Sequence, residues 1–119
     1  MPLQHYRELL AWQRAMDLAA AVYAVTKSFP ADERFGLTNQ LRRAAVSVPS
    51  NIAEGQGRGI SADFTRFMNI ANGSRQEVDT QLMLAQRFGY IDASTVNKIL
   101  DISAETGRLL SGLKRSVKT

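Results

Sequence analysis

Apolar residues recur along the chain at alternating intervals of three and four, the spacing that gathers side chains on one face of an α-helix. Four stretches carry such a stripe, at Leu9, Trp12, Met16, Ala19, Tyr23 and Thr26; at Leu37, Leu41, Ala44 or Ala45, Val48 and Ile52; at Phe64, Phe67, Ala71, Ser74, Val78, Gln81 and Ala85; and at Val96, Ile99 or Leu100, Ser103, Leu110, Leu113 and Val117. No useful length of sequence alternates with the period of two that a half-buried strand requires. The pattern therefore predicts four helices and no sheet.

Local signals separate the four predicted helices. Phe29-Pro30 ends the first helix, because a proline disfavours helical geometry in the residue before it. The glycine-rich run of residues 55–59 ends the second helix, Ser61 is the predicted N-cap of the third, and the fourth begins near Ala93. Since the links are short, neighbouring helices should run antiparallel. The predicted fold class is all-α, an up-down-up-down antiparallel four-helix bundle.

Pro49 interrupts the second predicted helix. A proline removes one backbone hydrogen bond and clashes with the carbonyl group four residues back, yet the apolar stripe continues through Val48 and Ile52. We therefore expect one helix that is kinked at Pro49 and bends around the core. The chain length of 119 residues is sufficient for one ordinary domain, which we place at residues 1–119.

Several apolar residues fall outside the four stripes, namely Leu10, Leu18, Val22, Met68, Leu84 and Leu109. A monomer that exposed all of them would tend to associate, so we expect a stable homo-oligomer. The aromatic residues lie mostly on the stripes or next to helix ends, and we interpret them as core anchors in preference to platforms for stacked bases. They are Tyr6, Trp12, Tyr23, Phe29, Phe35, Phe64, Phe67, Phe88 and Tyr90.

The chain is basic, with 15 Lys and Arg residues against 11 acidic residues and a net charge of +4. Most of the basic residues are arginines, whose planar guanidinium groups bind phosphate or carboxylate through paired hydrogen bonds. The excess of basic over acidic residues is greatest in residues 34–87 and in residues 106–119. The second of these segments contains no acidic residue. Basic groups at a helix C-terminus also complement the helix dipole. The charge pattern thus leaves open whether this surface binds an anionic partner.

Few residues could support catalysis or hold a metal ion. Cysteine is absent and the one histidine, His5, lies near the N-terminus, so the chain lacks a zinc or iron ligand set and a nucleophile–histidine arrangement. The candidate acids and bases are Glu54, Glu77 and Asp79. Residues 55–59 follow a helix and lack a following Gly-Lys-Ser/Thr, which indicates a helix end and not a phosphate loop. We expect no catalytic residue, no metal site and no cofactor.

Arg42 and Arg43 flank the apolar stripe of the second predicted helix, a position where ion pairs and subunit contacts form between packed helices. Glu77 occupies a similar flank of the third helix, one residue before Val78. We expect a structural ion pair between Glu77 and one of these arginines, either within the chain or between subunits. The alternative is that the two arginines reach phosphate groups.

Motifs spread over nearly the whole chain are shared with a known family. They comprise Trp12–Ala15, Phe29-Pro30, Phe35–Leu37, Gln40–Ala45, Ser47–Gly55, Phe64, Phe67, Ile70-Ala71, Gly73-Ser74, Glu77 and Gly89–Ile91. In these motifs the chain resembles the bacterial four-helix-bundle family, also called the ribosomal RNA intervening-sequence protein family. The resemblance implies a homopentamer of up-down bundles around a central channel. A related group, the accessory proteins of diversity-generating retroelements, binds nucleic acid, and most members have no established activity.

Two functions fit these observations. The first is a non-enzymatic oligomeric binding module that holds the backbone of RNA or DNA. Its expected contacts are Arg42, Arg43, Arg58, Arg66, Lys114, Arg115 and Lys118. The alternative is a scaffold for an acidic partner protein, with no nucleic-acid role. Because no run of about 18 apolar residues occurs, we expect a cytoplasmic protein without membrane contact.

Overall fold

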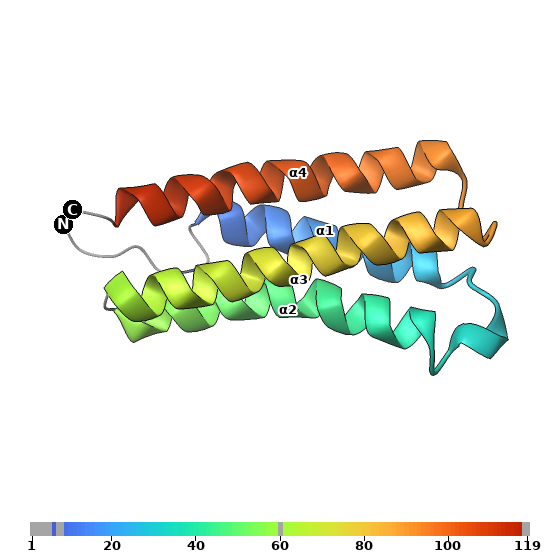
Figure 1. Cartoon of the computed structure of the whole chain (residues 1–119), viewed down its shortest axis with the longest axis horizontal. Helices are drawn as coiled ribbons and strands as arrows, with labels where there is room; N and C mark the ends of the chain where they lie inside the picture. Colours follow the sequence, from blue (N-terminus) through green and yellow to red (C-terminus); the bar gives the residue numbers. More distant parts are fainter. Residues whose placement is uncertain (1–5, 7–8, 60, 118–119) are drawn as a thin grey trace.

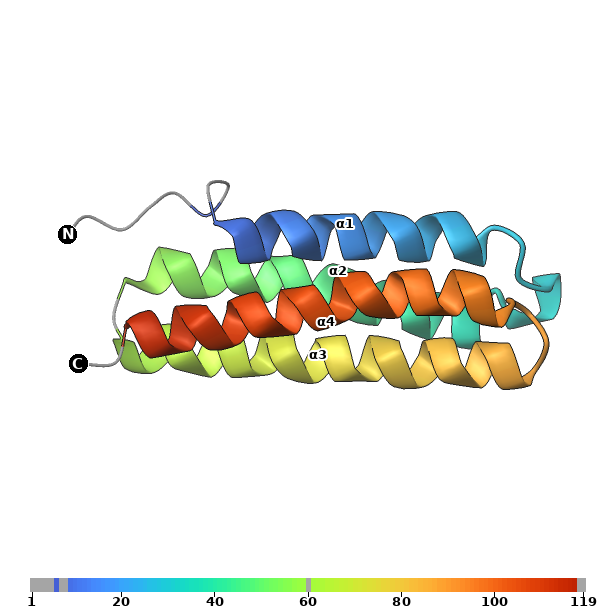
Figure 2. The same cartoon turned by 90° about the horizontal axis from the view of Figure 1, so that it is seen from above.

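The computed structural model describes residues 6, 9–59 and 61–117, most of which lie in four helices (Figure 1). The helices are α1 (Leu10–Thr26), α2 (Leu37–Arg58), α3 (Ser61–Arg87) and α4 (Ala93–Ser116), and a short 3-10 segment, η2 (Ala31–Glu33), precedes α2. Consecutive helices run antiparallel, and α1 packs against both α2 and α4 (Figures 1 and 2). The described residues contain no strand, so the predicted four-helix bundle is confirmed. None of these four helices is both long enough and apolar enough to span a membrane.

The helix ends lie close to their predicted positions. α2 continues through Gly55 and ends where Gly59 adopts the left-handed conformation, with φ at 72°, so only the last glycine of the predicted stop ends the helix. α3 begins at Ser61 itself. If Ser61 were the N-cap, as predicted, the helix would begin one residue later. Asp92 caps α4, because its carboxylate accepts a hydrogen bond from the backbone N–H of Thr95 at 2.8 Å.

α2 is a single continuous helix across Pro49, as predicted. Pro49 is buried, and Val48 and Ile52 beside it are fully buried, so the helix keeps its apolar face toward the core through the proline. The missing N–H of Pro49 leaves the carbonyl group of Ala45 without its helical partner. The kink itself stays a prediction.

α1 turns a different face toward the core from the predicted one. The buried residues of this helix are Ala11, Ala15, Leu18, Val22 and Thr26. By contrast, Met16 is 45% exposed and Tyr23 is 42% exposed, while Trp12 and Ala19 are half-buried. Leu9 and Thr26 of the predicted stripe are buried, but the prediction was wrong at Met16 and Tyr23. The reason is that α1 carries two apolar stripes, one residue and thus about 100° apart. The core takes the stripe with more small side chains, which lets α1 approach its neighbours closely.

The apolar residues predicted to remain outside the core divide into two groups. Leu18, Val22 and Met68 are fully buried and Leu109 packs against the core, so the prediction was wrong for these residues. Leu10 and Leu84 are exposed, as predicted. The other three helices bury most of their predicted stripes, and they add the fully buried side chains of Met68, Leu82 and Thr106.

The aromatic residues are not all core anchors. Phe29, Phe64 and Phe67 are buried, and Trp12 and Tyr90 pack against the core. The rings of three others, Tyr23, Phe35 and Phe88, are exposed, which corrects the interpretation for these residues.

α2 and α3 approach each other closely at Gly55. A Cβ atom at this position would lie 2.7 Å from Cε of Met68 and 2.8 Å from Cβ of Phe67. The end of the Met68 side chain can move, but Cβ of Phe67 is attached directly to the backbone of α3. Any side chain at position 55 therefore pushes the two helices apart.

We expect Gly55→Ala to lower the free energy of unfolding by about 1–3 kcal/mol, the usual cost of overpacking a core. Gly57→Ala is the matched control in the same helix, because no atom lies within 4 Å of a Cβ at that position. There alanine should stabilise the chain by up to about 1 kcal/mol through its better helix propensity. Urea unfolding followed by circular dichroism measures both changes. If the two variants change the free energy of unfolding by the same amount and in the same direction, the helices do not approach closely at Gly55.

Glu33 ties together three segments at one end of the bundle. Its Oε1 atom accepts a hydrogen bond from the backbone N–H of Leu37 at 2.9 Å, and its Oε2 atom accepts one from the hydroxyl group of Tyr90 at 2.8 Å. These bonds join η2 to the start of α2 and to the link between α3 and α4. The Leu37 N–H and then the Tyr90 hydroxyl lower the pKa of Glu33, and the same carboxylate raises the pKa of Tyr90.

The lowered pKa of Glu33 predicts a loss of stability in acid. The contribution of this carboxylate is fully present above its ordinary pKa of 4.5 and is lost as the pH falls through the lower pKa of the folded state. Glu33→Gln should lower the Tm at neutral pH and make the Tm decline less steeply below about pH 4.5. Glu54→Gln, which removes only an exposed ion pair with Arg58, is the control. If the Tm of Glu33→Gln falls as steeply with decreasing pH as the Tm of the parent, the Glu33 carboxylate does not contribute to this loss of stability in acid.

Candidate nucleic-acid interface

A groove between α3 and α4 contains two of the predicted phosphate contacts. It is a hollow of ≈ 290 Å³ lined by Thr65, Asn69, Ser111, Lys114 and Arg115. None of the described carboxylates lines it, and the ammonium group of Lys114 donates a hydrogen bond to the amide oxygen of Asn69 at 3.0 Å. Hydroxyl, amide and cationic groups of this kind make most protein contacts with nucleic-acid phosphates. We call this hollow the α3–α4 groove.

Helix geometry explains how the α3–α4 groove forms. Thr65 and Asn69 lie one turn apart near the start of α3, and Ser111 and Arg115 lie one turn apart near the end of α4. Because the two helices are antiparallel, the start of α3 lies beside the end of α4 (Figure 2). Lys114 and Arg115 also complement the negative end of the α4 dipole. Neither forms an ion pair with a described carboxylate, so both charges are available to a ligand.

Arg58 and Arg66 lie near the same end of the bundle but are engaged within the chain. Arg58 forms an ion pair with Glu54 at 2.8 Å, and Arg66 lies 3.8 Å from the carboxylate of Asp63. Both guanidinium groups also lie over the ring of Phe67, at 5.1 and 4.6 Å from its centre. Their charges are therefore largely balanced by neighbouring acids.

Arg42 packs between α1 and α2 and does not contact Glu77. Its Nε atom donates to the hydroxyl group of Thr26 at 2.7 Å, and its Nη2 atom donates to the carbonyl oxygen of Tyr23 at 3.4 Å. The guanidinium group also lies 4.6 Å from the centre of the Tyr23 ring. The prediction of an Arg42–Glu77 pair within the chain was wrong, because the side chain of Arg42 points toward α1 and Glu77 lies on α3.

Arg43 faces the other neighbour of α2, since successive helical residues are about 100° apart. It is exposed and lines a polar groove of ≈ 380 Å³ between α2 and α3, together with Glu77, Ser47 and Ser74 among others. Within the described residues Arg43 forms no ion pair with Glu77. Glu77 instead accepts a hydrogen bond from the Nε2 atom of the buried Gln81 at 3.4 Å. The intrachain pair is thus not formed, and a pair between subunits stays a prediction.

The seven predicted contact residues do not form one patch. Arg42 and Arg43 lie in the first two turns of α2, whereas Arg58 ends it, which places the two sites about 24 Å apart along the helix. Lys118, like His5, lies outside the described residues. The structure therefore divides the predicted surface into two parts. One is the α3–α4 groove with Arg58 and Arg66 near it, both of which lie against acids of the chain, and the other is a separate site at Arg43.

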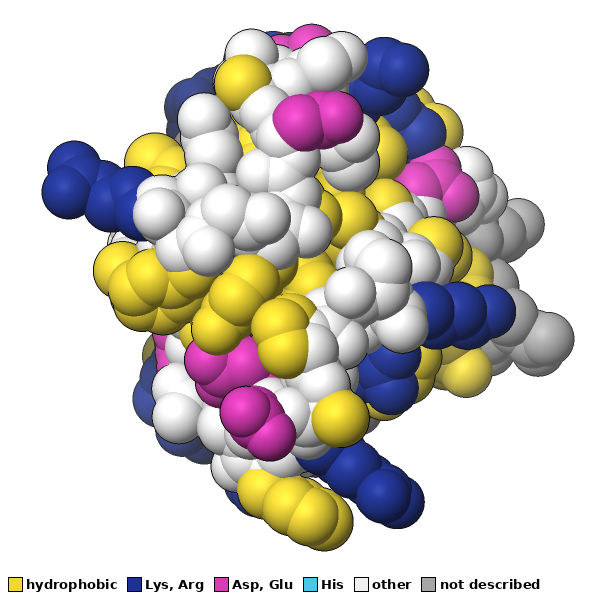
Figure 3. All heavy atoms as spheres, turned by 90° about the vertical axis from the view of Figure 1, so that its right-hand side faces the viewer, with side chains coloured by type: hydrophobic (Ala, Val, Ile, Leu, Met, Phe, Trp, Pro, Cys, Tyr) yellow, Lys and Arg dark blue, Asp and Glu magenta, His cyan; other side chains and the backbone are white. Residues whose placement is uncertain are grey.

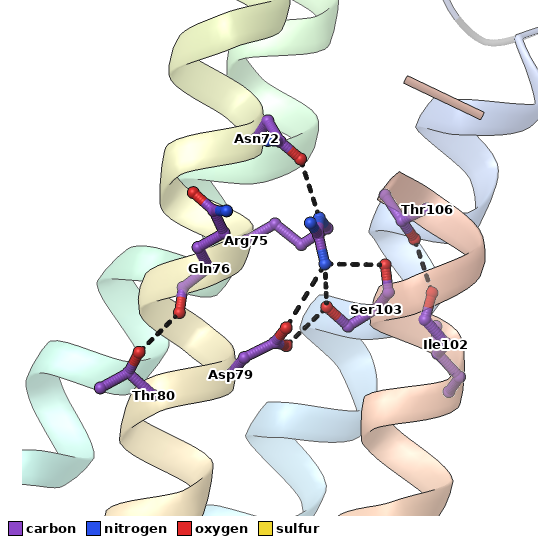
Figure 4. Close-up of polar contacts among 8 residues, drawn as sticks. All are labelled: Asn72, Arg75, Gln76, Asp79, Thr80, Ile102, Ser103 and Thr106. Carbon is purple, nitrogen blue, oxygen red and sulfur yellow. Dashed lines mark hydrogen bonds and ion pairs between the residues drawn. The ribbon is translucent and has the colours of Figure 1, made fainter. Parts of the chain in front are cut away.

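A second polar cluster lies between α3 and α4, halfway along the bundle (Figure 4). Arg75 donates to the carboxylate of Asp79 at 3.3 Å, to the hydroxyl group of Ser103 at 3.2 Å and to the side chain of Asn72 at 3.0 Å. Ser103 donates to the same carboxylate at 2.6 Å. The side chain of Arg75 is only 15% exposed, and Gly107 leaves room for its guanidinium group. The cluster holds α3 against α4.

The cluster around Arg75 does not resemble a catalytic site. The carboxylate of Asp79, a candidate acid or base in the sequence, is engaged by both Arg75 and Ser103. Ser103 is fully buried, and no histidine is described beside it to act as a base. Among the described residues, no group of three acidic or histidine side chains could hold a metal ion.

Sequence reasoning missed the uncharged members of the α3–α4 groove. Thr65, Asn69 and Ser111 belong to no motif, and each is an ordinary polar residue of a helix, half-buried at Thr65 and exposed at the other two. The available signal was the acid-free C-terminal segment, combined with the antiparallel pairing of the third and fourth helices. Together these would have pointed to polar residues in the first three turns of α3.

The fold and the α3–α4 groove define an antiparallel four-helix-bundle protein with a basic surface groove that, among the described residues, contains no carboxylate. The chain belongs to the 23S rRNA-intervening sequence protein family, whose profile matches residues 7–112, and the resemblance seen in the sequence is confirmed. A crystal structure of a protein of unknown function from the S23 ribosomal protein family of Bacteroides thetaiotaomicron has a similar fold. The two chains share 24% sequence identity with a TM-score of 0.80, over 89% of this chain and 96% of that one. No curated protein matches the chain.

The neighbouring arginines of α2 should respond differently to substitution. Arg42→Ala removes hydrogen bonds from a cation and its contact with the Tyr23 ring, and should lower the free energy of unfolding by about 1–2 kcal/mol. Arg43→Ala, its matched control, should change that free energy by less than about 0.5 kcal/mol. Urea unfolding at a concentration where both variants have the same oligomeric state measures the difference. Equal losses would show that Arg42 does not fasten α1 to α2.

Proposed function

We propose that the chain is a non-enzymatic oligomeric module that binds the backbone of RNA or DNA through the α3–α4 groove. The observation that carries this proposal is that Lys114 and Arg115 line a hollow together with hydroxyl and amide groups, and that no carboxylate of the described chain lies among them. Binding a phosphate there would release counterions from the nucleic acid, which supplies affinity that does not depend on sequence. Arg43, which forms no ion pair with a described acid, is a further cation available to the same polyanion.

The groove favours contact with the backbone over contact with base edges. Its short hydroxyl and amide side chains lie at the seam of two helices, and a seam does not protrude as a recognition helix must to enter the major groove. We therefore expect similar affinity for different sequences, and for RNA and DNA of similar charge density.

Exposed apolar surface supports the oligomeric part of the proposal. Large apolar side chains are exposed on the described chain, including Leu10, Phe35 and Met83, and a homo-oligomer would cover part of this surface. The family resemblance implies five subunits. With +4 per chain, a pentamer would carry a charge of about +20, and a polyanion touching several grooves at once would bind far more tightly than one groove allows. We place this activity in the cytoplasm and assign it no membrane contact.

Replacing Lys114, Arg115 and Lys118 together by Gln tests the groove. The variant should bind RNA and DNA at least about ten-fold more weakly, and the slope of log K against log salt should fall by about 0.9 for each phosphate that the variant no longer neutralises. The matched control replaces Lys27, Arg87 and Lys98 by Gln, which removes the same charge at the opposite end of the bundle. Fluorescence anisotropy with a labelled oligonucleotide over a salt series measures both variants.

Two results would overturn the nucleic-acid proposal. Equal weakening by the two triple variants would show that only net charge matters and that the α3–α4 groove is not a site. If the parent retains neither RNA nor DNA at about 50 mM salt, the basic surface serves another anion. The scaffold for an acidic partner protein would then be the better account.

A further inference from the structure

Phe35 is the most exposed large apolar side chain of the described chain, at 84% exposure. It lies in the turn between η2 and α2, at the end of the bundle shown in Figure 3, where hydrophobic side chains emerge among acidic and basic ones. The turn is well fixed, because Gly36 donates its N–H to the carbonyl oxygen of Glu33 at 3.0 Å and Leu37 donates to the Glu33 side chain. Phe35 is thus a protruding ring on a rigid turn.

The same tripeptide, Arg-Phe-Gly, occurs a second time at this end of the bundle. Arg87-Phe88-Gly89 begins at the last residue of α3, and Arg34-Phe35-Gly36 directly precedes the start of α2. Phe88 is less exposed, at 56%, since its ring lies 5.6 Å from that of Tyr90. The ring of Phe35 has no described aromatic neighbour, and the guanidinium group of Arg34 lies 5.3 Å from its centre. Of the two phenylalanines, Phe35 is the one whose ring packs on no other ring of the described chain.

An apolar groove on the side of the bundle could receive a ring such as that of Phe35 from another molecule. It has a volume of ≈ 380 Å³, lies between α1 and α2, and is lined by eight residues, among them Trp12, Met16, Val46 and Ser50. None of these residues is charged, so the groove does not suit a phosphate backbone. It is formed by the stripe that α1 turns away from the core. We call it the α1–α2 groove.

We propose that Phe35 of one copy of the chain inserts into the α1–α2 groove of a second copy. This inference rests on the oligomeric part of the proposed function and specifies its contact. The protruding ring and the groove lie at different places on one chain, so every copy offers one of each. Such a contact is heterologous and is repeated from copy to copy, which generates a ring when the rotation closes.

Charge and area both favour a second copy as the occupant. Arg34, beside the ring, forms no ion pair with a described residue. Glu54, whose Oε2 atom pairs with Arg58 at 2.8 Å, lies one turn beyond Ser50 on the face of α2 that borders the groove, and its Oε1 atom could accept a further pair from Arg34 of the second copy. One phenylalanine buries about 150–250 Å², whereas a stable interface needs roughly 1,000 Å². The exposed side chains of Met16 and Val46 on the groove side supply further apolar area. Phe35 would then act as the central anchor of a larger contact.

The test uses one variant without the ring, Phe35→Ala, and one with a blocked groove, Met16→Glu. Both positions are exposed, so each variant should keep the circular dichroism spectrum of the parent. Each alone should raise the dissociation constant for self-association about 30-fold or more, as expected when a central anchor is lost. An equimolar mixture should form a particle of two chains and nothing larger, because only one intact ring and one intact groove can meet. Sedimentation velocity at micromolar concentration measures all four samples.

Phe88→Ala is the matched control and should keep the assembly of the parent. If Phe35→Ala also keeps that assembly, or if the mixture stays monomeric, the inference is overturned while the oligomeric proposal stands. A parent chain that is itself monomeric at micromolar concentration overturns both the inference and the oligomeric proposal.

Salt-dependent oligonucleotide binding by the monomeric variants, measured per chain, tests the α3–α4 groove separately from assembly. If the parent does not self-associate but binds a different, apolar protein through the α1–α2 groove, that result also contradicts the inference.

Discussion

The rotation of α1 about its own axis determines what much of the bundle presents to solvent. Because small side chains of α1 face the core, the stripe that contains Trp12 is turned outward and forms one wall of the α1–α2 groove. Two polar contacts fix this rotation from opposite sides. Arg14 donates to Glu105 of α4 at 2.9 Å, and Arg42 of α2 donates to Thr26 at 2.7 Å. Turning the other stripe inward would break both contacts and would require larger side chains to enter a closely packed seam.

Polar groups inside the other seams fix how the helices align along their lengths. The hydroxyl groups of Ser47 and Ser74 lie 2.8 Å apart between α2 and α3, and Arg75, Asp79 and Ser103 bond between α3 and α4. Apolar contacts alone tolerate a shift of one helical turn, since one aliphatic side chain can replace another. A buried polar group that loses its partner costs about 1–3 kcal/mol, so the same shift would be strongly disfavoured here. Apolar burial therefore holds the bundle together, while these clusters select one alignment.

The number of helices, their order and most of their boundaries could be predicted because each depends on local signals, namely a stripe with helical spacing, a proline or a final glycine. The buried face of α1 could not, since two apolar stripes lie side by side and only packing against the other helices chooses between them. The site was predicted in part. Lys114 and Arg115 stand out as cations in an acid-free segment, but Arg42 and Arg43 look alike in sequence and are separated only by the neighbours that α2 acquires in the bundle.

The distribution of paired and unpaired arginines changes how the net charge should be understood. Arg58, Arg66 and Arg75 lie against carboxylates of their own chain, so their charges contribute little to the field at a distance. One α3–α4 groove then offers two uncompensated cations among the described residues, Lys114 and Arg115, and two phosphate contacts bind weakly at physiological salt. A useful affinity for a polyanion requires several such grooves at fixed spacing, which only assembly provides. The proposed nucleic-acid binding would therefore depend on the proposed self-association, because the contact that joins the subunits would set the spacing at which a backbone meets the grooves.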